Sequence, residues 1–170
     1  LRDFVHNQLA GDIIACYDGG WNDRGTKTAN FGEIRELSTM PGCLIEVAFH
    51  DEPNDAQALT TPAFREIAAR GIYQGIVDYF ADADATTATY VPEQPTHLYA
   101  QNSAAGSITL AWNAPPSVCG SDAATAYRVY MGTHGRGFAD AIPTMNNTYT
   151  VSGLNPNTTY YFRVSATNAG

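Results

Sequence analysis

A single carboxylate stands out among the residues that could do chemistry. Glu46 lies in an otherwise apolar run, Cys43–Phe49, which follows the turn residues Pro41 and Gly42. An apolar run of this length between turn residues and helical patterns is typical of a strand buried on both faces of a parallel sheet. A buried carboxylate is costly unless it is paired, binds a metal or takes part in a reaction. Glu46 is therefore the candidate catalytic residue, and Arg35 is the nearest candidate for a purely structural ion pair.

The loop after this run is acidic. It lies at the carboxyl end of the expected strand, where open α/β sheets bind their ligands. Its carboxylates are oxygen donors of the kind that bind cations. A solvated acidic loop is the simpler interpretation. The residues concerned are His50, Asp51, Glu52 and Asp55.

Histidines and cysteines give no metal-binding pattern. The four histidines lack the paired spacing of metal ligands, and we interpret each as an ordinary surface or core residue. Three scattered cysteines are too few for a disulfide framework. A bridge between Cys16 and Cys43 would fit an oxidising compartment, and the sequence leaves it open. The histidines are His6, His50, His97 and His134.

Two helices are expected on either side of the Glu46 run. Apolar residues at helical spacing over Leu1–Tyr17 predict an amphipathic helix that ends at a Gly-Gly turn. A second helix is predicted from Pro62, with Thr61 as its N-cap. Residues 30–37 fit a short strand without excluding other structure. Together these elements describe part of a mixed or parallel α/β domain with helices on the faces of its sheet.

The second expected helix contains two interior glycines, Gly71 and Gly75. Each costs on the order of 1 kcal/mol against Ala in a helix interior. A packing reason is therefore expected, and with Ala68 these positions would let the helix approach the sheet closely.

The periodicity changes beyond the middle of the chain. Residues 82–94 read as a linker between a domain at 1–81 and a domain at 95–170. In the second domain apolar residues alternate with polar ones and Gly, Pro and Asn turns separate the runs, which predicts an antiparallel β-sandwich. The alternating segments are 107–112, 127–131, 149–151 and 160–166.

Charge and hydropathy exclude several classes of partner. The formal charge is −8, with nine Lys and Arg in 170 residues. A nucleic acid or an anionic membrane needs a basic surface, so neither is expected as a partner. No run is long and apolar enough to span a membrane, and the start carries no signal peptide. The chain begins without Met and opens on an uncapped helix, so we expect a fragment of a longer protein.

Three features of the second domain occur together in one known family. Trp112 lies on its second expected strand, Tyr127–Tyr130 on the third, and Leu154–Ala166 follows a Leu-x-Pro-x-Thr-x-Tyr-x-Phe-x-Val-x-Ala pattern. These residues resemble those of a fibronectin type III domain, with Tyr160 at the tyrosine-corner position, where a buried ring needs a partner for its hydroxyl. The resemblance implies an all-β sandwich whose last strand is missing at 168–170. It assigns these residues to the core.

Segments of residues 1–81 resemble the C-terminal part of a zinc-dependent N-acetylmuramoyl-L-alanine amidase of the type 3 family, which has a mixed α/β fold. The resemblance rests on the order and spacing of several pieces rather than on any one. They are Arg24–Lys27, Phe31–Arg35, Met40–Phe49, Pro53–Asp55, Phe64–Ala68 and Gly71–Phe80.

The resemblance gives Glu46 a role. It implies that Glu46 is the catalytic acid/base, which takes a proton from a zinc-bound water and delivers it to the leaving amine. The family's zinc ligands, His, Glu and His, lie upstream of the matching segment, so the Zn²⁺ of the intact enzyme has no ligand here. Two departures are Ala48, where the family usually has Gly, and His50-Asp51-Glu52, where it usually has Leu-Ser-Asn.

Two hypotheses of different class follow from the resemblance. The first is a secreted or cell-envelope bacterial peptidoglycan hydrolase that cleaves between N-acetylmuramic acid and L-alanine, inactive as this fragment alone. Its fibronectin type III domain would act as a spacer or would bind polysaccharide or other envelope proteins. The second is a catalytically degenerate protein that uses both domains for wall binding or adhesion. A different enzyme on the same scaffold remains open, since fold does not fix function.

Overall fold

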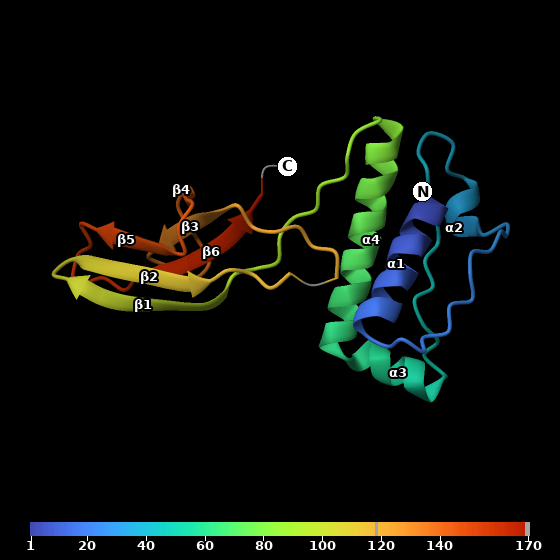
Figure 1. Cartoon of the computed structure of the whole chain (residues 1–170), viewed down its shortest axis with the longest axis horizontal. Coiled ribbons are helices and arrows are strands. Elements are labelled where there is room, and N and C mark those ends of the chain that lie inside the picture. Colours follow the sequence, from blue (N-terminus) through green and yellow to red (C-terminus); the bar gives the residue numbers. More distant parts are fainter. Residues whose placement is uncertain (118, 169–170) are drawn as a thin grey trace. The chain divides into compact units, whose positions relative to one another are not determined.

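The first unit of the chain, Leu1–Thr89, is built from helices. This computed structural model describes residues 1–117 and 119–168. Figure 1 shows the first and last helices of the unit side by side. Among the described residues, no helix combines the length and the apolar character that crossing a membrane requires. The helices are α1 (Arg2–Cys16), α2 (Gly32–Arg35), α3 (Pro53–Thr60) and α4 (Pro62–Ala83).

Helices α1 and α4 form the core of this unit, and the sequence predicted both. The close packing expected of the glycines in α4 is confirmed, but their neighbour is α1 and not a sheet. A Cβ atom at Gly75 would lie 2.5 Å from Val5 Cα, and one at Gly71 would lie 2.8 Å from Leu9 Cα. The buried apolar residues at this interface are Val5, Leu9 and Ile13 of α1 and Phe64, Ile67 and Ala68 of α4.

The predicted parallel sheet is wrong for this part of the structure. Residues 1–89, all of which are described, contain helices and connecting segments but no β-strand, and Cys43–Phe49 is one of the connecting segments. A strand is completed by backbone hydrogen bonds to a neighbouring strand. No strand lies beside Cys43–Phe49 in this unit, so its apolar sequence does not produce a strand. Residues 32–35 form one helical turn, although the sequence of 30–37 also fits a short strand.

Helix α3 lies where the sequence indicated an acidic loop. Glu52 Oε2 accepts hydrogen bonds from the backbone N–H groups of Asn54 (2.8 Å) and Asp55 (3.0 Å), and Pro53 occupies the first helical position. These are features of a helix start. Thr61 is the N-cap residue of α4 as predicted, but its hydroxyl donates back to Gln57 O (2.9 Å) rather than capping α4.

The second unit, Tyr90–Gly170, has the predicted β-sandwich architecture. One sheet has the strand order β1-β2-β5 and the other β4-β3-β6, and all pairs are antiparallel. The predicted missing last strand concerns residues 168–170, of which 169–170 lie outside the described part of the chain. The strands are β1 (Thr96–Ala104), β2 (Ser107–Asn113), β3 (Ala126–Gly132), β4 (Ile142–Thr144), β5 (Thr148–Ser152) and β6 (Tyr161–Thr167).

The core of the sandwich contains only part of the residues that carried the sequence pattern. Trp112 and Tyr127 are buried, whereas Arg128, Tyr161 and Arg163 are exposed, so their predicted place in the core is wrong. Leu110 and Val129 are fully buried, and the rings of Trp112 and Tyr127 meet edge to face with centroids 5.3 Å apart. The N–H of Asn155 donates to the hydroxyl of Tyr160 (3.0 Å). The predicted tyrosine corner therefore has its hydrogen-bond partner.

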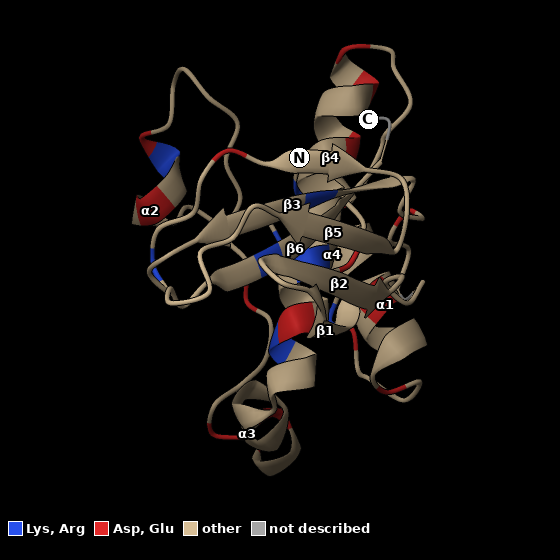
Figure 2. Ribbon diagram, turned by 90° about the vertical axis from the view of Figure 1, so that its left-hand side faces the viewer, with Lys and Arg blue, Asp and Glu red and all other residues tan. Residues whose placement is uncertain are grey.

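Charge is divided unevenly between the two units. The first holds 14 acidic and six basic residues, so it accounts for the whole formal charge of −8. The second holds three acidic and three basic residues, the latter all Arg. Figure 2 marks these positions along the ribbon. Electrostatic attraction to a polyanion would therefore have to come from local clusters.

Candidate functional site

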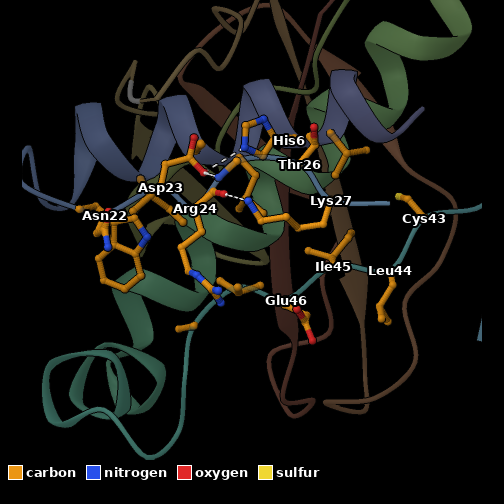
Figure 3. Close-up of a pocket in the computed structure, with 18 of the residues that line it drawn as sticks. His6, Asn22, Asp23, Arg24, Thr26, Lys27, Cys43, Leu44, Ile45 and Glu46 are labelled. Atoms are coloured by element: carbon orange, nitrogen blue, oxygen red, sulfur yellow. Dashed lines mark hydrogen bonds and ion pairs between the residues drawn. The ribbon is translucent and has the colours of Figure 1, made fainter. Parts of the chain in front are cut away.

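An open pocket of about 1240 Å³ lies within the first unit and contains Glu46 on its wall. The other walls come from one side of α1, the loop 17–29 and the start of α3. Figure 3 shows side chains of α1, of the loop and of the segment 43–46 around the pocket. The pocket thus combines an apolar helix face with charged groups from irregular segments, where binding residues are often found.

Glu46 lies in the pocket wall with its side chain exposed, so the predicted burial is wrong. It forms no hydrogen bond or ion pair with any described residue. The structural ion pair with Arg35 is not formed, because Arg35 Nε bonds Glu36 Oε1 at 3.0 Å. A carboxylate in a pocket without a protein partner is available to accept a proton or to bind a ligand.

A His–Asp pair lies on the opposite side of the pocket. His6 Nε2 of α1 lies 3.0 Å from Asp23 Oδ1, and the same oxygen accepts the Gly25 N–H at 2.8 Å (Figure 3). Gly25 has a φ of +68°, a conformation that favours glycine. The pair therefore fastens the loop 22–28 to α1. The only local sequence pattern at this pair is the Asp-x-Gly turn at 23–25, which does not indicate His6 as a partner.

The protonation of His6 is coupled to this loop. The hydrogen bond to Asp23 raises the pKa of His6 above its ordinary value of 6.5. The Gly25 N–H, and then His6, lower the pKa of Asp23. A raised pKa in the folded state means that the pair stabilises the loop fully below about pH 6.5 and loses this effect as the pH rises through the folded-state pKa. Both side chains are partly exposed, so the contribution is small.

Replacing the carboxylate partner should return His6 to ordinary behaviour. Asp23→Asn is expected to lower the pKa of His6 and to make the Gly25 amide exchange faster at pH 6, because the charged acceptor for both groups is lost. NMR pH titration of the His6 ring and amide exchange at Gly25 measure these effects. Asp18→Asn is the matched control, since Asp18 Oδ1 accepts the Gly20 N–H (2.9 Å) in the same loop and is not paired with His6. An unchanged His6 pKa in Asp23→Asn would contradict the assignment.

Two contacts hold the end of the Glu46 segment. The N–H of Phe49 donates to Asp55 Oδ2 at 2.9 Å, and the Arg24 guanidinium lies over the Phe49 ring, 5.0 Å from its centroid. Asp55 thus connects Phe49 to α3 and Arg24 connects it to the loop 22–28. The acidic loop of the sequence therefore holds backbone N–H groups through Glu52 and Asp55.

Three aromatic rings fix the start of the pocket loop. Phe64 of α4 is fully buried, and its centroid lies 4.9 Å from that of Tyr17 and 5.0 Å from that of Trp21. The rings join the C-terminal end of α1 to the loop. The sequence placed Phe64 on the apolar face of α4 but did not indicate these partners.

The described residues contain no group of three or more His, Cys, Asp or Glu side chains suited to a metal ion. His6 lies in the pocket, His50 is exposed beyond the Glu46 segment, and His97 and His134 belong to the second unit. Cys43 is a free, half-buried cysteine on the pocket wall. The bridge between Cys16 and Cys43 that the sequence left open is therefore not formed.

Comparison with known families divides the chain in two. Residues 6–78 match the N-acetylmuramoyl-L-alanine amidase family. Residues 93–170 match the fibronectin type III domain. The two matches are consecutive and do not overlap, so each unit has its own relatives.

The curated relatives match the first part of the chain only partially. The N-acetylmuramoyl-L-alanine amidase CwlM of Bacillus licheniformis is 40% identical over 79 residues, which are 46% of this chain and 28% of that protein. The N-acetylmuramoyl-L-alanine amidase LytC of Bacillus subtilis (strain 168) is 41% identical over 80 residues, 47% of this chain and 15% of that protein. The chain thus spans less than a third of the length of either relative.

A solved structure is similar to the second part of the chain. The sixth fibronectin type III domain from human fibronectin type III domain containing protein 3 is 29% identical. The match covers 47% of this chain and 74% of that domain, with a TM-score of 0.39.

Proposed function

Because the chain carries an N-acetylmuramoyl-L-alanine amidase segment followed by a fibronectin type III domain, we propose that the protein hydrolyses bacterial peptidoglycan. The bond cleaved is the amide between N-acetylmuramic acid and L-alanine, and the site of action is the cell envelope. The amidase match over residues 6–78 is the observation that carries this proposal. The whole reaction belongs to the intact enzyme, of which these residues supply one part.

That part is proton transfer by Glu46. Amide hydrolysis requires a base that takes a proton from the attacking water and an acid that gives one to the leaving nitrogen. A carboxylate that faces a pocket and is free of ion pairs is accessible for both proton transfers. Glu46 meets these conditions, and the contacts of Phe49 with Asp55 and Arg24 fix the end of its segment.

The role proposed for Glu46 does not require this chain to bind zinc. The amidase family is zinc-dependent, and a zinc site needs three or four His, Cys, Asp or Glu donors around one point. The described residues hold no such group, so they do not fit a zinc site. We expect the zinc ligands of the intact enzyme to come from other residues.

The test is the loss of turnover in Glu46→Gln. The amide is close in size to the carboxylate but cannot accept the proton, so a fall in kcat of about 10²- to 10⁴-fold is expected, with wall binding retained. The measurement is the release of peptides with new N-terminal L-alanine from purified peptidoglycan by the full-length protein. Glu36→Gln is the control, because Glu36 is exposed, pairs with Arg35 and does not line the pocket.

Two outcomes would contradict the proposal. Unchanged peptide release in Glu46→Gln would remove Glu46 from the reaction. Wall binding by the full-length protein without turnover or bound zinc would favour the catalytically degenerate wall-binding protein, to which Ala48 and the His50-Asp51-Glu52 loop would then be relevant.

A further inference from the structure

One face of the second unit concentrates its positive charge. Of the three Arg residues in this unit, Arg128 lies on β3 and Arg163 on β6, and Arg136 lies in the loop between β3 and β4. The two strands are neighbours in the sheet β4-β3-β6. Arg128 and Arg163 are both exposed and form no ion pair with any described residue. Their charge is therefore available to a partner.

The register of the two strands places these arginines with aromatic rings. Residues paired across antiparallel strands point to the same side of the sheet. Tyr127 and Val129 are buried in the core, so the alternate residues of β3 face outward. The outward pairs are Arg128–Ser165, Tyr130–Arg163 and Gly132–Tyr161. We call Arg128, Tyr130, Tyr161 and Arg163 the Arg–Tyr face.

The Arg–Tyr face is a connected cluster. The Arg163 guanidinium carbon lies 6.0 Å from the centroid of the Tyr130 ring, and the Ser165 hydroxyl donates to Tyr130 Oη at 3.5 Å. The pKa of Tyr130 is lowered by this hydrogen bond and also by Arg128 and Arg163. Two guanidinium groups thus act on one phenol. Tyr161 is 44% exposed, so a second aromatic ring is accessible on the same face.

This combination fits a polymer of sugar rings that carries carboxylates. A guanidinium group binds a carboxylate with two parallel hydrogen bonds, and an aromatic ring offers an apolar surface to the face of a sugar. The stem peptides of peptidoglycan carry free carboxylates along a sugar chain. We infer that the Arg–Tyr face binds peptidoglycan, its carboxylates to Arg128 and Arg163 and its sugar rings to the tyrosines. The choice of this polymer rests on the proposed function.

A sedimentation assay with peptidoglycan stripped of wall teichoic acids tests this inference. The 170-residue chain is expected to co-sediment with the sacculi, and Arg163→Gln should weaken binding roughly tenfold, because one charge-assisted contact is lost. Arg35→Gln is the charge-matched control and should bind like the unchanged chain, because Arg35 is an exposed residue of α2 in the first unit. Arg163→Lys, which keeps the charge but loses the planar fork, should restore only part of the binding. Circular dichroism verifies that each variant is folded.

Three results would overturn the inference. Equal losses in Arg163→Gln and Arg35→Gln would mean that only net charge matters. Binding to walls that retain teichoic acids but not to stripped sacculi would assign the face to a phosphate polymer. If the chain does not bind sacculi but self-associates, and Arg163→Gln abolishes the self-association, then the Arg–Tyr face binds a second copy of the chain.

The binding test is separate from the test of catalysis. If Glu46→Gln abolishes turnover while Arg163→Gln binds sacculi normally, the inference fails and the proposed function stands. If the full-length protein never releases peptides while Arg163→Gln loses binding, the inference stands and the proposed function fails.

Discussion

Gly75→Ala is expected to lower the free energy of unfolding of the first unit by about 2 kcal/mol. The added Cβ would lie 2.5 Å from Val5 Cα and 2.8 Å from Phe4 O. Both atoms belong to the backbone of α1, so no side-chain rotation relieves the overlap and the helices must separate. The higher helix propensity of Ala, on the order of 1 kcal/mol, offsets only part of this cost. Urea unfolding followed by far-ultraviolet circular dichroism measures the change.

Gly11 offers the matched control. It lies in the interior of α1, it is exposed, and a Cβ atom there would meet nothing within 4 Å. Gly11→Ala should therefore stabilise the unit by about 0.5–1 kcal/mol through helix propensity alone. Stabilisation of similar size by Gly75→Ala would show that α1 and α4 do not pack as closely as described.

Phe64→Ala is expected to cost about 3–5 kcal/mol in the free energy of unfolding of the first unit. The side chain is fully buried, and its removal leaves a cavity beneath Tyr17 and Trp21. The same change should loosen the pocket loop, because those two rings lose the surface on which they pack. The urea midpoint reports the stability, and the fluorescence of Trp21 in a Trp112→Phe background reports the loop.

Phe80→Ala serves as the control for this substitution. Phe80 lies on the same helix but is 56% exposed, so its truncation should change the stability by about 0.5 kcal/mol or less. Similar losses in the two variants would mean that Phe64 has no special place in the core.

The elements that could be predicted are those whose packing partners lie within the chain. Helix α4 is indicated by Pro62 and by apolar spacing, and the face so defined packs against α1. Strands β2, β3 and β6 are indicated by alternation, and each has a neighbouring strand in its sheet. In these cases the periodicity and the burial agree.

The error at Cys43–Phe49 has a physical cause. An apolar run indicates that a segment is suited to burial, but it does not identify the neighbours that would bury it. A strand exists only with a paired strand, and none accompanies this segment in the described unit. Helix α3 is not predicted from the sequence for a different reason. Its start depends on Glu52 as the N-cap and on Pro53, and both residue types also suit a turn.

The candidate site was predictable only in part. Glu46 can be singled out from the sequence because it is the only charged residue in the apolar run Cys43–Phe49. His6 and Asp23 are 17 positions apart and meet through the path of the loop. No local pattern encodes that meeting. The contact of Arg24 with Phe49 likewise depends on tertiary structure.

The unequal division of charge has a consequence for work at a polyanionic surface. The first unit, with a formal charge of −8, is repelled over a distance set by the Debye length, about 30 Å at 0.01 M salt and about 8 Å at 0.15 M. Added salt therefore lets the pocket approach an anionic wall, whereas it weakens the attraction of Arg128 and Arg163. Access and attachment respond to ionic strength in opposite directions, so if the protein acts on an anionic wall as proposed, we expect its activity there to be highest at an intermediate salt concentration.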